Sequence, residues 1–391
     1  MNLLIRKSFK YRIYPTRAQV SNLENQFSMC RHLYNWNLKE RIEAYEKDGT
    51  IISYNQQQNQ LPQLKIERPW YKGVYSQVLQ DVLRRLDNGY QAFFRRVENG
   101  ETPGFPNFKK HGEWNSITYP QYHAFPESRI KVPKVGIVKT VHHRQIPKEA
   151  EIKTLTIIRE GCKWFACFSV ELPLDIEPEQ DLQNAIGIDF GLNDFLYASD
   201  GSHVSTPKFL RKSLDKLARL QRRFARAKKR SARWYKLLKA IRKCHYKIRC
   251  QRHDFLHKTA NALLKLGNVI CHEDLNIRGM SRRPKPVQDK DGKYLPNRAS
   301  VKAGLNKSIN DAGWYQFLLY LKYKAVEQGK QIIGVPPQYT SQKCSACGQI
   351  VKKSLSVRTH RCSCGFVANR DHNAAINILC VGLDTLATSV A

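Results

Sequence analysis

The stretch that decides the fold of this chain is AIGIDFGLNDFLYASDG, which spans residues 185–201. An apolar strand leads to Asp189, a short turn follows, and a second apolar strand leads away from it, so the pattern predicts a β-hairpin. The hairpin offers the carboxylate of Asp189 at the end of an apolar strand. Taken alone, an aspartate at a hairpin is more often a turn residue than a ligand.

Two later stretches make Asp189 a stronger candidate for a functional residue. The segment NVICHEDL brings Glu273 to the end of a second apolar strand, and RDHNAAINIL places Asp371 at the start of a short helix. Three carboxylates so far apart in the chain act together only if the fold gathers them. The nearby acids Asp194, Asp200 and Asp274 are weaker candidates.

Composition indicates what the chain binds. The 391 residues include 66 Lys and Arg against 33 Asp and Glu, a formal charge of +33, which predicts a polyanionic partner with nucleic acid as the leading candidate. No stretch approaches the ~18 apolar residues of a membrane-spanning helix, and the first residues, MNLLIRKSFKYR, do not form a signal-type apolar run. We therefore expect that the protein has no membrane partner. We expect it to lie in the reducing cytoplasm of a prokaryotic cell, at the nucleoid.

The first half of the chain predicts a small β-barrel with a helical insertion. Period-two patterns predict strands within 129–138, 151–160 and 163–172, and the N-terminal strand 3–14 could complete the barrel. Between them the following elements are expected: a helix or two over 17–46 capped by Thr16, a loop over 53–63, a helix over 76–98, and a loop over 100–112. An acidic stretch, residues 171–183, reads as a linker.

The second half predicts an α/β domain because strands and helices alternate. Residues 208–258 carry twenty Lys or Arg and two acids, yet apolar residues persist at helical spacing. This combination predicts a helical hairpin with one packed face and one basic face that contacts phosphates. The remaining expected elements are a helix over 254–266, a mobile polar segment over 281–300, a helix over 310–328 and a strand over 330–335.

Four cysteines near the C-terminus form the most specific local signal. Cys344 and Cys347 are separated by 14 residues from Cys362 and Cys364, and a glycine follows each pair. Four thiolates in this spacing predict a structural zinc site of the zinc-ribbon type, the alternative being two pairs of buried or redox cysteines. The second pair has one intervening residue where two are usual, so His360 is the substitute ligand if Cys364 cannot reach.

The three acids fit one kind of chemistry. Hydrolysis of a phosphodiester by two metal ions needs several carboxylates to hold two Mg²⁺ about 3.5–4 Å apart, and Mg²⁺ accepts few protein ligands. Asp189 and Glu273 at strand ends and Asp371 on a helix have the order and settings of a ribonuclease H-like nuclease. We therefore predict that these three residues are catalytic and bind Mg²⁺, with Zn²⁺ as a second, structural metal.

The sequence also resembles a known family. The motifs GIDFGLND, CHEDLNIRGM, VPPQYTSQKCSACG and CGFVANRDHNAAINIL resemble those of the TnpB family, transposon-encoded RNA-guided nucleases related to the type V CRISPR effectors. The N-terminal KSFKYRIYPTRAQ and the region from SQVLQDVLRRLDNGYQAFFRR to GFPNFKK are similar to that family too. The shortened second cysteine pair and the tail after Ile378 depart from the common pattern, but neither departure touches a candidate catalytic acid.

The resemblance implies a fold class of α/β plus β-barrel. It implies a RuvC-like, RNase H-like nuclease domain with an inserted zinc ribbon, preceded by a wedge-like barrel that carries a helical recognition insertion. The implied boundaries are 1–15 and 111–180 for the wedge, 16–110 for the recognition insertion, 181–335 and 368–391 for the nuclease domain, and 336–367 for the zinc-ribbon module that handles the target strand.

The resemblance further implies the partners: a guide RNA, a target double-stranded DNA and its displaced strand. The expected function is RNA-guided DNA cleavage by Mg²⁺-dependent hydrolysis. The alternatives are a guided DNA-binding protein that does not cleave, a transposition-associated factor without strand-joining activity, and a strand-joining transposase, which the order Asp, Glu, Asp disfavours. None of these patterns specifies an oligomeric state.

Overall fold

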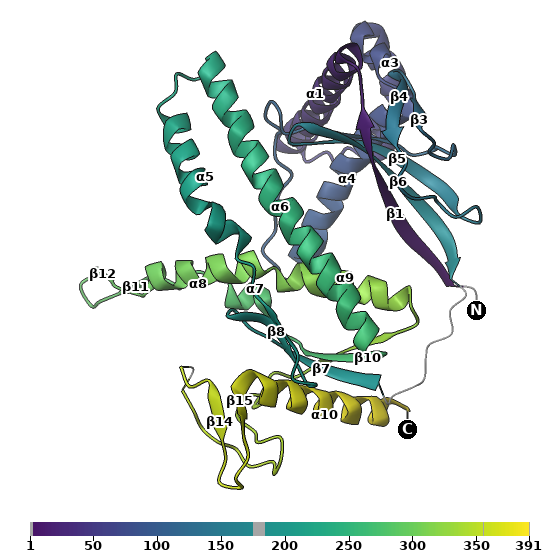
Figure 1. The fold of residues 1–391 in the computed structure, drawn as a ribbon. Coiled ribbons are helices and arrows are strands. Elements are labelled where there is room, and N and C mark those ends of the chain that lie inside the picture. The colour runs from purple at the N-terminus through teal and green to yellow at the C-terminus, as the bar shows by residue number, and fades with distance from the viewer. Residues whose placement is uncertain (1–2, 175–183, 355, 391) are drawn as a thin grey trace. The chain divides into compact units, whose positions relative to one another are not determined.

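A computed structural model describes residues 3–174, 184–354 and 356–390 (Figure 1). The chain divides into two compact units, residues 1–175 and residues 176–391. No helix among the described residues is both long and apolar enough to cross a bilayer. Residues 175–183 of the expected acidic linker lie outside the described part of the chain, and residues 171–174 belong to a strand.

Unit 1 is built on a six-stranded antiparallel sheet with the strand order β2-β5-β6-β1-β4-β3. The predicted N-terminal strand does join it, because β1 pairs with β6 from Leu3 to Ile13. The strands are β1 (Leu3–Tyr14), β2 (Ser116–Tyr119), β3 (Arg129–Val132), β4 (Gly136–Val141), β5 (Glu151–Glu160) and β6 (Lys163–Leu174).

The sheet curls into a half-barrel, which bears out the barrel prediction in its coarse form. β2 and β3 are the two edge strands of the described sheet. Side chains reach from the side of β2 toward β3: the hydroxyl of Tyr119 donates to the carbonyl of Pro133 at 3.2 Å, and that of Tyr122 donates to the carbonyl of Lys131 at 3.1 Å. These bonds draw the edges together where no strand pairing does.

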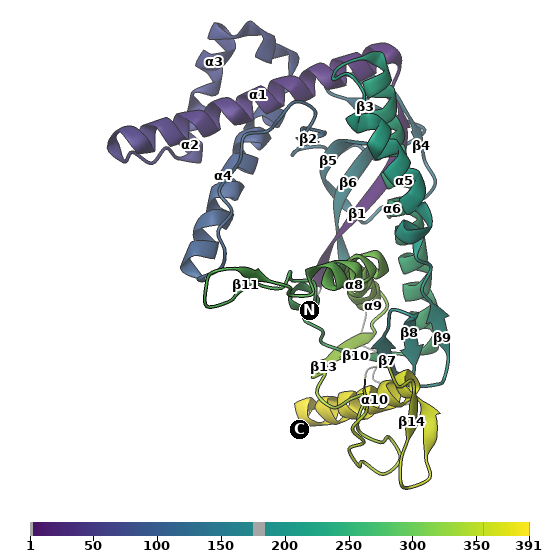
Figure 2. The ribbon, with the colours of Figure 1, turned by 90° about the vertical axis from the view of Figure 1, so that its left-hand side faces the viewer.

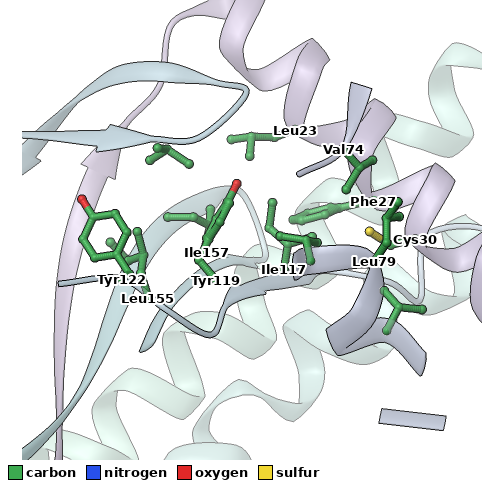
Figure 3. Close-up of a cluster of buried hydrophobic side chains, with 14 of the residues drawn as sticks. Leu23, Phe27, Cys30, Val74, Leu79, Ile117, Tyr119, Tyr122, Leu155 and Ile157 are labelled. Carbon is green, nitrogen blue, oxygen red and sulfur yellow. The ribbon is translucent and has the colours of Figure 1, made fainter. Parts of the chain in front are cut away.

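The helices of unit 1 lie between β1 and β2 in the sequence, as the predicted insertion requires. They are α1 (Arg17–Asp48), α2 (Tyr54–Asn59), α3 (Leu61–Glu67), the 3₁₀ helix η1 (Pro69–Gly73) and α4 (Ser76–Glu98). Thr16 caps α1, as the sequence predicted, and the cap is a capping box formed with Gln19. Figure 3 shows how Leu23, Phe27 and Cys30 of α1 pack with Leu79 of α4 and with residues of the sheet in one hydrophobic core.

The prediction of a loop over 53–63 is wrong, because α2 and α3 occupy that stretch. The polar composition hid two local helix signals. Ser53 and Gln56 form a reciprocal capping box at the start of α2, and Pro62 lies in the first turn of α3, where proline is tolerated. The loop expected over 100–112 is confirmed, since the chain has neither helix nor strand there.

Unit 2 contains a five-stranded mixed sheet with the order β13-β10-β7-β8-β9. The predicted hairpin is β7 (Ala185–Phe190) with β8 (Asp194–Ala198), and β9 (His203–Ser205) extends it. On the other side, β10 (Val269–Glu273) runs parallel to β7 and β13 (Gln331–Val335) runs parallel to β10. The alternating α/β prediction is confirmed in this half.

Helices cover both faces of this sheet, as Figures 1 and 2 show. α9 (Trp314–Val326) and the C-terminal part of α6 (Ala232–Leu266) pack with Ile186, Ile188 and Ile270 on one face. α10 (Arg370–Val390) packs on the other face, where Ile378 meets Val269 and Cys271. α10 was predicted as a short helix but continues through the motif-free tail, because the tail residue Gly382 lies directly against Cys271.

The basic hairpin of unit 2 consists of α5 (Phe209–Ala225) and α6. Its apolar stripe packs as predicted, with Leu217 and Leu237 buried and the rings of Phe224 and Trp234 4.9 Å apart. The prediction of a separate helix over 254–266 is wrong, because these residues form the last part of α6. No glycine or proline interrupts that stretch, so one helix continues through it.

The stretch over 281–300 was expected to lack structure, but it contains a small β-hairpin of β11 (Val287–Gln288) and β12 (Tyr294–Leu295). Asp289 closes its turn by accepting backbone N–H bonds from Asp291 and Lys293. The helix predicted over 310–328 begins earlier, as α8 (Ala299–Ala312), and breaks at Gly313, which has a φ of 75°. The short helix α7 (Ile277–Met280) follows β10, and β14 (Thr359–Arg361) pairs with β15 (Val367–Asn369) ahead of α10.

Candidate active site and cysteine cluster

Side-chain alternation places Asp189 on the face of the sheet that α10 covers. Ile188 and Phe190 of β7 belong to the core on the opposite face, whereas Gly187 faces α10. Asp189 therefore points with Gly187 toward α10. Its carboxylate is only partly exposed, and burial among protein atoms raises its pKa well above the usual value.

Glu273 lies on the same face at the end of β10. Ile270 belongs to the opposite core and Cys271 to the core beneath α10, so the alternation carries Glu273 to the α10 side. It is 9% exposed, and its carboxylate accepts a hydrogen bond from the hydroxyl of Thr340. Burial raises the pKa of Glu273, and the Thr340 bond lowers it in part.

Asp371 lies in the first turn of α10, where the helix dipole favours a negative charge. Its backbone N–H donates to the side chain of Asn369 at 2.8 Å, and Arg358 approaches its carboxylate at 3.5 Å. The three acids are gathered: after burial, the charges of Glu273 and then Asp371 are the next causes that raise the pKa of Asp189, while Arg370 opposes them.

Two glycines set how closely α10 approaches the sheet. A Cβ on Gly187 would lie 2.1 Å from the carbonyl oxygen of Ala375, and a Cβ on Gly382 would lie 2.2 Å from the sulfur of Cys271. No side chain fits at either position. The close approach brings the first turn of α10, with Asp371, to the strand ends that carry the other two acids.

The weaker candidate acids have other roles or partners. Asp200 accepts the backbone N–H of Ser202 at 2.8 Å, which is a turn function. Asp194 accepts from the hydroxyl of Ser205 at 3.3 Å. The backbone of Asp274 continues the pairing toward Val335, and none of the three contributes to the raised pKa of Asp189.

Sequence reasoning missed the residues that support the site. Thr340 positions Glu273, as described above. Asn373 and Asn377 of α10 are buried and tie the helix to the segment before the cysteines: Asn373 donates to the carbonyl of Lys343 at 2.8 Å, and Asn377 donates to the carbonyl of Thr340 at 2.8 Å. The signal was present as two amides four residues apart within an apolar helical stretch, since buried polar groups need partners.

The four predicted cysteine ligands do come together. All four sulfur atoms lie within 4.8 Å of one another, and the described residues contain no other group of three or more potential ligands that converges in this way. Cys344 and Cys364 are 3.8 Å apart and Cys347 and Cys362 are 3.6 Å apart, sulfur to sulfur. His360 is not needed as a substitute, because Cys364 reaches the cluster despite its shorter loop.

His360 instead packs beside the cluster. It is fully buried, one ring nitrogen contacts the ammonium of Lys353, and burial followed by the Lys353 charge lowers its pKa. Within the cluster, the backbone N–H of Cys364 lowers the pKa of Cys362 to about 7. Despite an N–H bond from Gln349 that lowers it, the pKa of Cys347 is raised to about 12 by the neighbouring sulfurs. The Cys362 thiolate therefore forms more readily than that of Cys347, whose ionisation a bound cation would favour.

The chain is strongly basic, has a four-cysteine module, and contains a mixed α/β sheet with two acids beneath a helix that carries the third. This is the make-up of a RuvC-like nuclease. Known proteins support this class. The Escherichia coli (strain K12) protein named "Putative RNA-guided DNA endonuclease InsQ" is 33% identical over 97% of this chain and 93% of its own length. A Streptomyces pristinaespiralis protein named "Putative RNA-guided DNA endonuclease" is 30% identical over 97% of this chain and 90% of its own. The chain therefore belongs to the TnpB/OrfB_IS605 family of RNA-guided DNA endonucleases, and the resemblance stated from the motifs is confirmed.

Family models match three segments of the chain. Residues 314–378 match the Cas12f1-like TNB domain, residues 167–283 match the OrfB_IS605 model described as a probable transposase, and residues 1–50 match a helix-turn-helix domain of the same group. The first match contains all four cysteines and relates the family to Cas12f. Among solved structures, the Cas12f1-sgRNA-target DNA complex is 14% identical with a TM-score of 0.47, covering 96% of this chain and 98% of that chain.

Proposed function

We propose that this chain is an RNA-guided DNA endonuclease in which Asp189, Glu273 and Asp371 bind Mg²⁺ and hydrolyse the target DNA. The observation that carries the assignment of the site is the proximity of the three carboxylates: after burial, the charges of Glu273 and Asp371 raise the pKa of Asp189. Gathering like charges in a partly buried place is unfavourable unless a cation offsets them. Their proximity, which is looser than that of the four cysteine sulfurs, therefore supports a site that a cation would draw together.

The donor set fits Mg²⁺. Carboxylate oxygens are hard ligands, and a site with two or three acids leaves room for the waters that Mg²⁺ retains. When bound, Mg²⁺ ions supply an activated water and stabilise the leaving oxygen of the phosphodiester. Asp189 and Glu273 hold their carboxylates on one face of the sheet, Thr340 fixes the orientation of Glu273, and α10 brings Asp371 opposite them.

The cysteine cluster fits a structural Zn²⁺. Sulfurs about 2.3 Å from a tetrahedral ion lie roughly 3.8 Å from one another, and the two measured separations are 3.8 and 3.6 Å. All four protein ligands are used, which leaves no open position for a substrate. We infer that zinc stabilises the module and that the cluster takes no part in the cleavage.

Family membership supports a proposal for the partners and for the roles of the domains. We propose a guide RNA, target double-stranded DNA and its displaced strand as partners, met at the nucleoid in a prokaryotic cytoplasm. In this proposal residues 1–15 and 111–180 act as the wedge and residues 16–110 as the recognition insertion. Within unit 2, residues 181–335 and 368–391 form an RNase H-like nuclease domain, which the mixed five-stranded sheet supports, and residues 336–367 form the zinc module.

The test uses protein expressed with its own flanking genomic sequence. The complex should retain a defined RNA, and that RNA with a matching target should support DNA cleavage that leaves 5′-phosphate ends. Asp189→Ala should abolish cleavage while guided binding stays near normal, and Asp200→Ala, a turn aspartate outside the site, should cleave as the wild type does. Cleavage at the wild-type rate by Asp189→Ala would show that the site is misassigned.

Two other outcomes would redirect the function. Guided binding without cleavage by the wild-type protein would favour a DNA-binding or transposition-associated factor. Joined rather than hydrolysed DNA ends would favour a transposase.

A further inference from the structure

Unit 1 contains a cavity that plays no part in the proposed nuclease chemistry. It has a volume of about 930 Å³, within the roughly 300–1,000 Å³ of pockets that hold small molecules. α1, the segment around α2, α4 and the loop after α4 line it. We call it the aromatic pocket after the side chains that dominate its walls: Tyr45, Tyr54, Tyr90, Phe93, Phe94 and Phe105.

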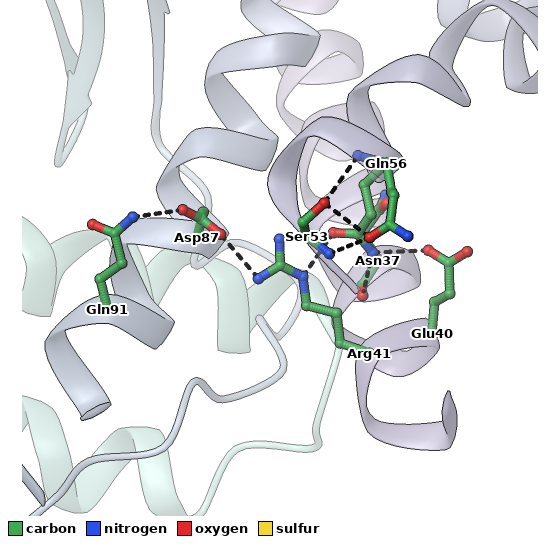
Figure 4. Close-up of polar contacts among 8 residues, drawn as sticks. Asn37, Glu40, Arg41, Ser53, Gln56, Asp87 and Gln91 are labelled. Carbon is green, nitrogen blue, oxygen red and sulfur yellow. Dashed lines mark hydrogen bonds and ion pairs between the residues drawn. The ribbon is translucent and has the colours of Figure 1, made fainter. Parts of the chain in front are cut away.

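One arginine that lines the aromatic pocket has a nitrogen without a hydrogen-bond partner among the described residues. Arg41 is 8% exposed, its Nε donates to Gln57 at 2.8 Å, and its Nη1 donates to Asp87 at 3.1 Å (Figure 4). Its third nitrogen, Nη2, is buried and has no hydrogen-bond partner among the described residues. Leaving such a donor without an acceptor is unfavourable, so the site favours a ligand that brings an acceptor.

The acceptor should be neutral. Asp87 already compensates the charge of Arg41, and its second oxygen accepts from Gln91 at 2.8 Å. A carboxylate or phosphate placed deep in the pocket would therefore meet a negative neighbour as well as the arginine. A carbonyl oxygen on an uncharged body meets the free N–H without that repulsion.

The walls suit a flat ring. Phe105 lies edge-on to Tyr90 and to Phe93, with ring centroids 5.4 Å apart in both pairs. Phe94 is 50% exposed and Phe105 is 44% exposed, so ring surfaces remain open to a ligand. Aromatic side chains in such a setting stack on nucleobases, each of which has a π-face.

The edges of the aromatic pocket are basic. The guanidinium of Arg84 lies over the ring of Tyr54, 5.8 Å from its centroid. Nη1 of Arg96 lies 3.2 Å from the point that a Cβ on Gly104 would occupy, next to Phe105. Positive charge beside two lining residues is complementary to phosphates on either side of a ring that enters the pocket.

We propose that the aromatic pocket binds one unpaired nucleobase with a carbonyl oxygen, taken from a single-stranded segment of the bound nucleic acid. The base stacks on the open faces of Phe94 and Phe105, its carbonyl accepts from Arg41, and Arg84 and Arg96 contact the flanking phosphates. This inference rests on the proposed function only in requiring that nucleic acid is the partner.

The experiment measures binding and needs no cleavage. The probes are short dye-labelled single strands in which every position is abasic except a central guanine, made with RNA and with DNA backbones. Fully abasic strands serve as references, and strands with a central adenine, which lacks the carbonyl, test the role of Arg41. Fluorescence anisotropy with the full-length protein, freed of co-purifying RNA, gives the affinities.

The wild-type protein should bind the guanine probe at least about tenfold more tightly than the abasic strand, the effect of one stacked base, and more tightly than the adenine probe. Phe94→Ala should lose most of that difference, because its exposed ring contributes to stacking and little to folding. Phe125→Ala is the matched control, since Phe125 is 46% exposed in the same unit but does not line the pocket. Phe105→Ala in the loop should repeat the effect of Phe94→Ala.

Phosphate contacts give a further internal check. The salt dependence of binding should be the same in Phe94→Ala and the wild type, because no phosphate contact is removed. Equal affinity for guanine and abasic probes, or equal discrimination by Phe94→Ala and the wild type, overturns the proposal. Preference for the RNA or the DNA backbone identifies the guide or the target as the source of the base. Failure of guided cleavage would count against the proposed function. It would not change the conclusion about the aromatic pocket, which rests on the binding measurements alone.

Discussion

A methyl group on Gly187 should disable the nuclease without touching a carboxylate. In Gly187→Ala, the new Cβ would lie 2.1 Å from the carbonyl oxygen of Ala375, 2.7 Å from the backbone nitrogen of Leu379 and 2.9 Å from its Cβ. Ordinary contacts between such atoms are about 3.5 Å or longer, so α10 has to retreat by roughly 1 Å. The contact is with helix backbone, which no side-chain rotation relieves.

The magnitude has two parts. Overpacking of this kind costs about 1–3 kcal/mol of unfolding free energy, and the reduced freedom of the unfolded chain returns only about 0.4–1 kcal/mol. The same shift moves Asp371 away from Asp189 and Glu273, and a displacement of about 1 Å in a catalytic group costs on the order of 100-fold in rate. We therefore expect lower stability and a cleavage rate reduced by about two orders of magnitude.

Denaturant unfolding and single-turnover cleavage by the purified RNA complex provide the two measurements. Gly334→Ala is the matched control, since it lies in the same sheet on β13 and its Cβ would have an ordinary contact, 3.6 Å from the Cβ of Asp274. It should keep near-normal stability and rate. Wild-type stability and rate in Gly187→Ala would refute the close docking of α10 on β7.

Further perturbations address the other parts of the chain. Thr340→Val should lower the cleavage rate by about 10–100-fold, because the carboxylate of Glu273 loses the hydrogen bond that positions it. The measurement is the Mg²⁺ dependence of the rate. Thr385→Val, on the exposed part of α10, should leave the rate unchanged. Cys364→Ser should lose zinc, as metal analysis would show, and should lower the melting temperature of the module in calorimetry. Cys380→Ser, outside the cluster, should keep one zinc per chain. Lowering the pH should destabilise unit 1 through His32, whose pKa is lowered by burial and then by the charge of Arg68.

The sign of the pH effect follows from the direction of that shift. An imidazole whose folded-state pKa lies below its unfolded value of about 6.5 resists protonation in the folded state. The stability it contributes is present above that value and is lost as the pH falls through the folded pKa. His32→Gln should flatten this dependence in unfolding curves measured between neutral and mildly acidic pH, and an unchanged curve would remove His32 as its source.

Local patterns predicted most elements correctly because their causes are local. Apolar spacing gave α4, the predicted cap at Thr16 marked the start of α1, and alternation gave β5 and β6. Two of the errors, over 53–63 and 281–300, fell where polar composition was taken as absence of structure. After Tyr54, α2 consists of asparagine and glutamine, yet Gln57 is fully buried and donates to Asn37 and accepts from Arg41. A buried polar side chain with partners from a distant helix has no local signature.

By itself, the sequence determined which groups are available: three acids at element ends, four cysteines in two spaced pairs, an excess of positive charge and the motifs of a family. The tertiary structure decided which of them meet. β7 and β10 are neighbours only because a parallel pairing joins Ala185 to Val269, and that register puts Asp189 and Glu273 on the face that α10 covers. Thr340, Asn373, Gly187 and the unpaired nitrogen of Arg41 acquire their roles only there. The physical reason is that periodicity and capping act over a few residues, whereas strand order, register and close helix docking are set by contacts between segments far apart in the chain.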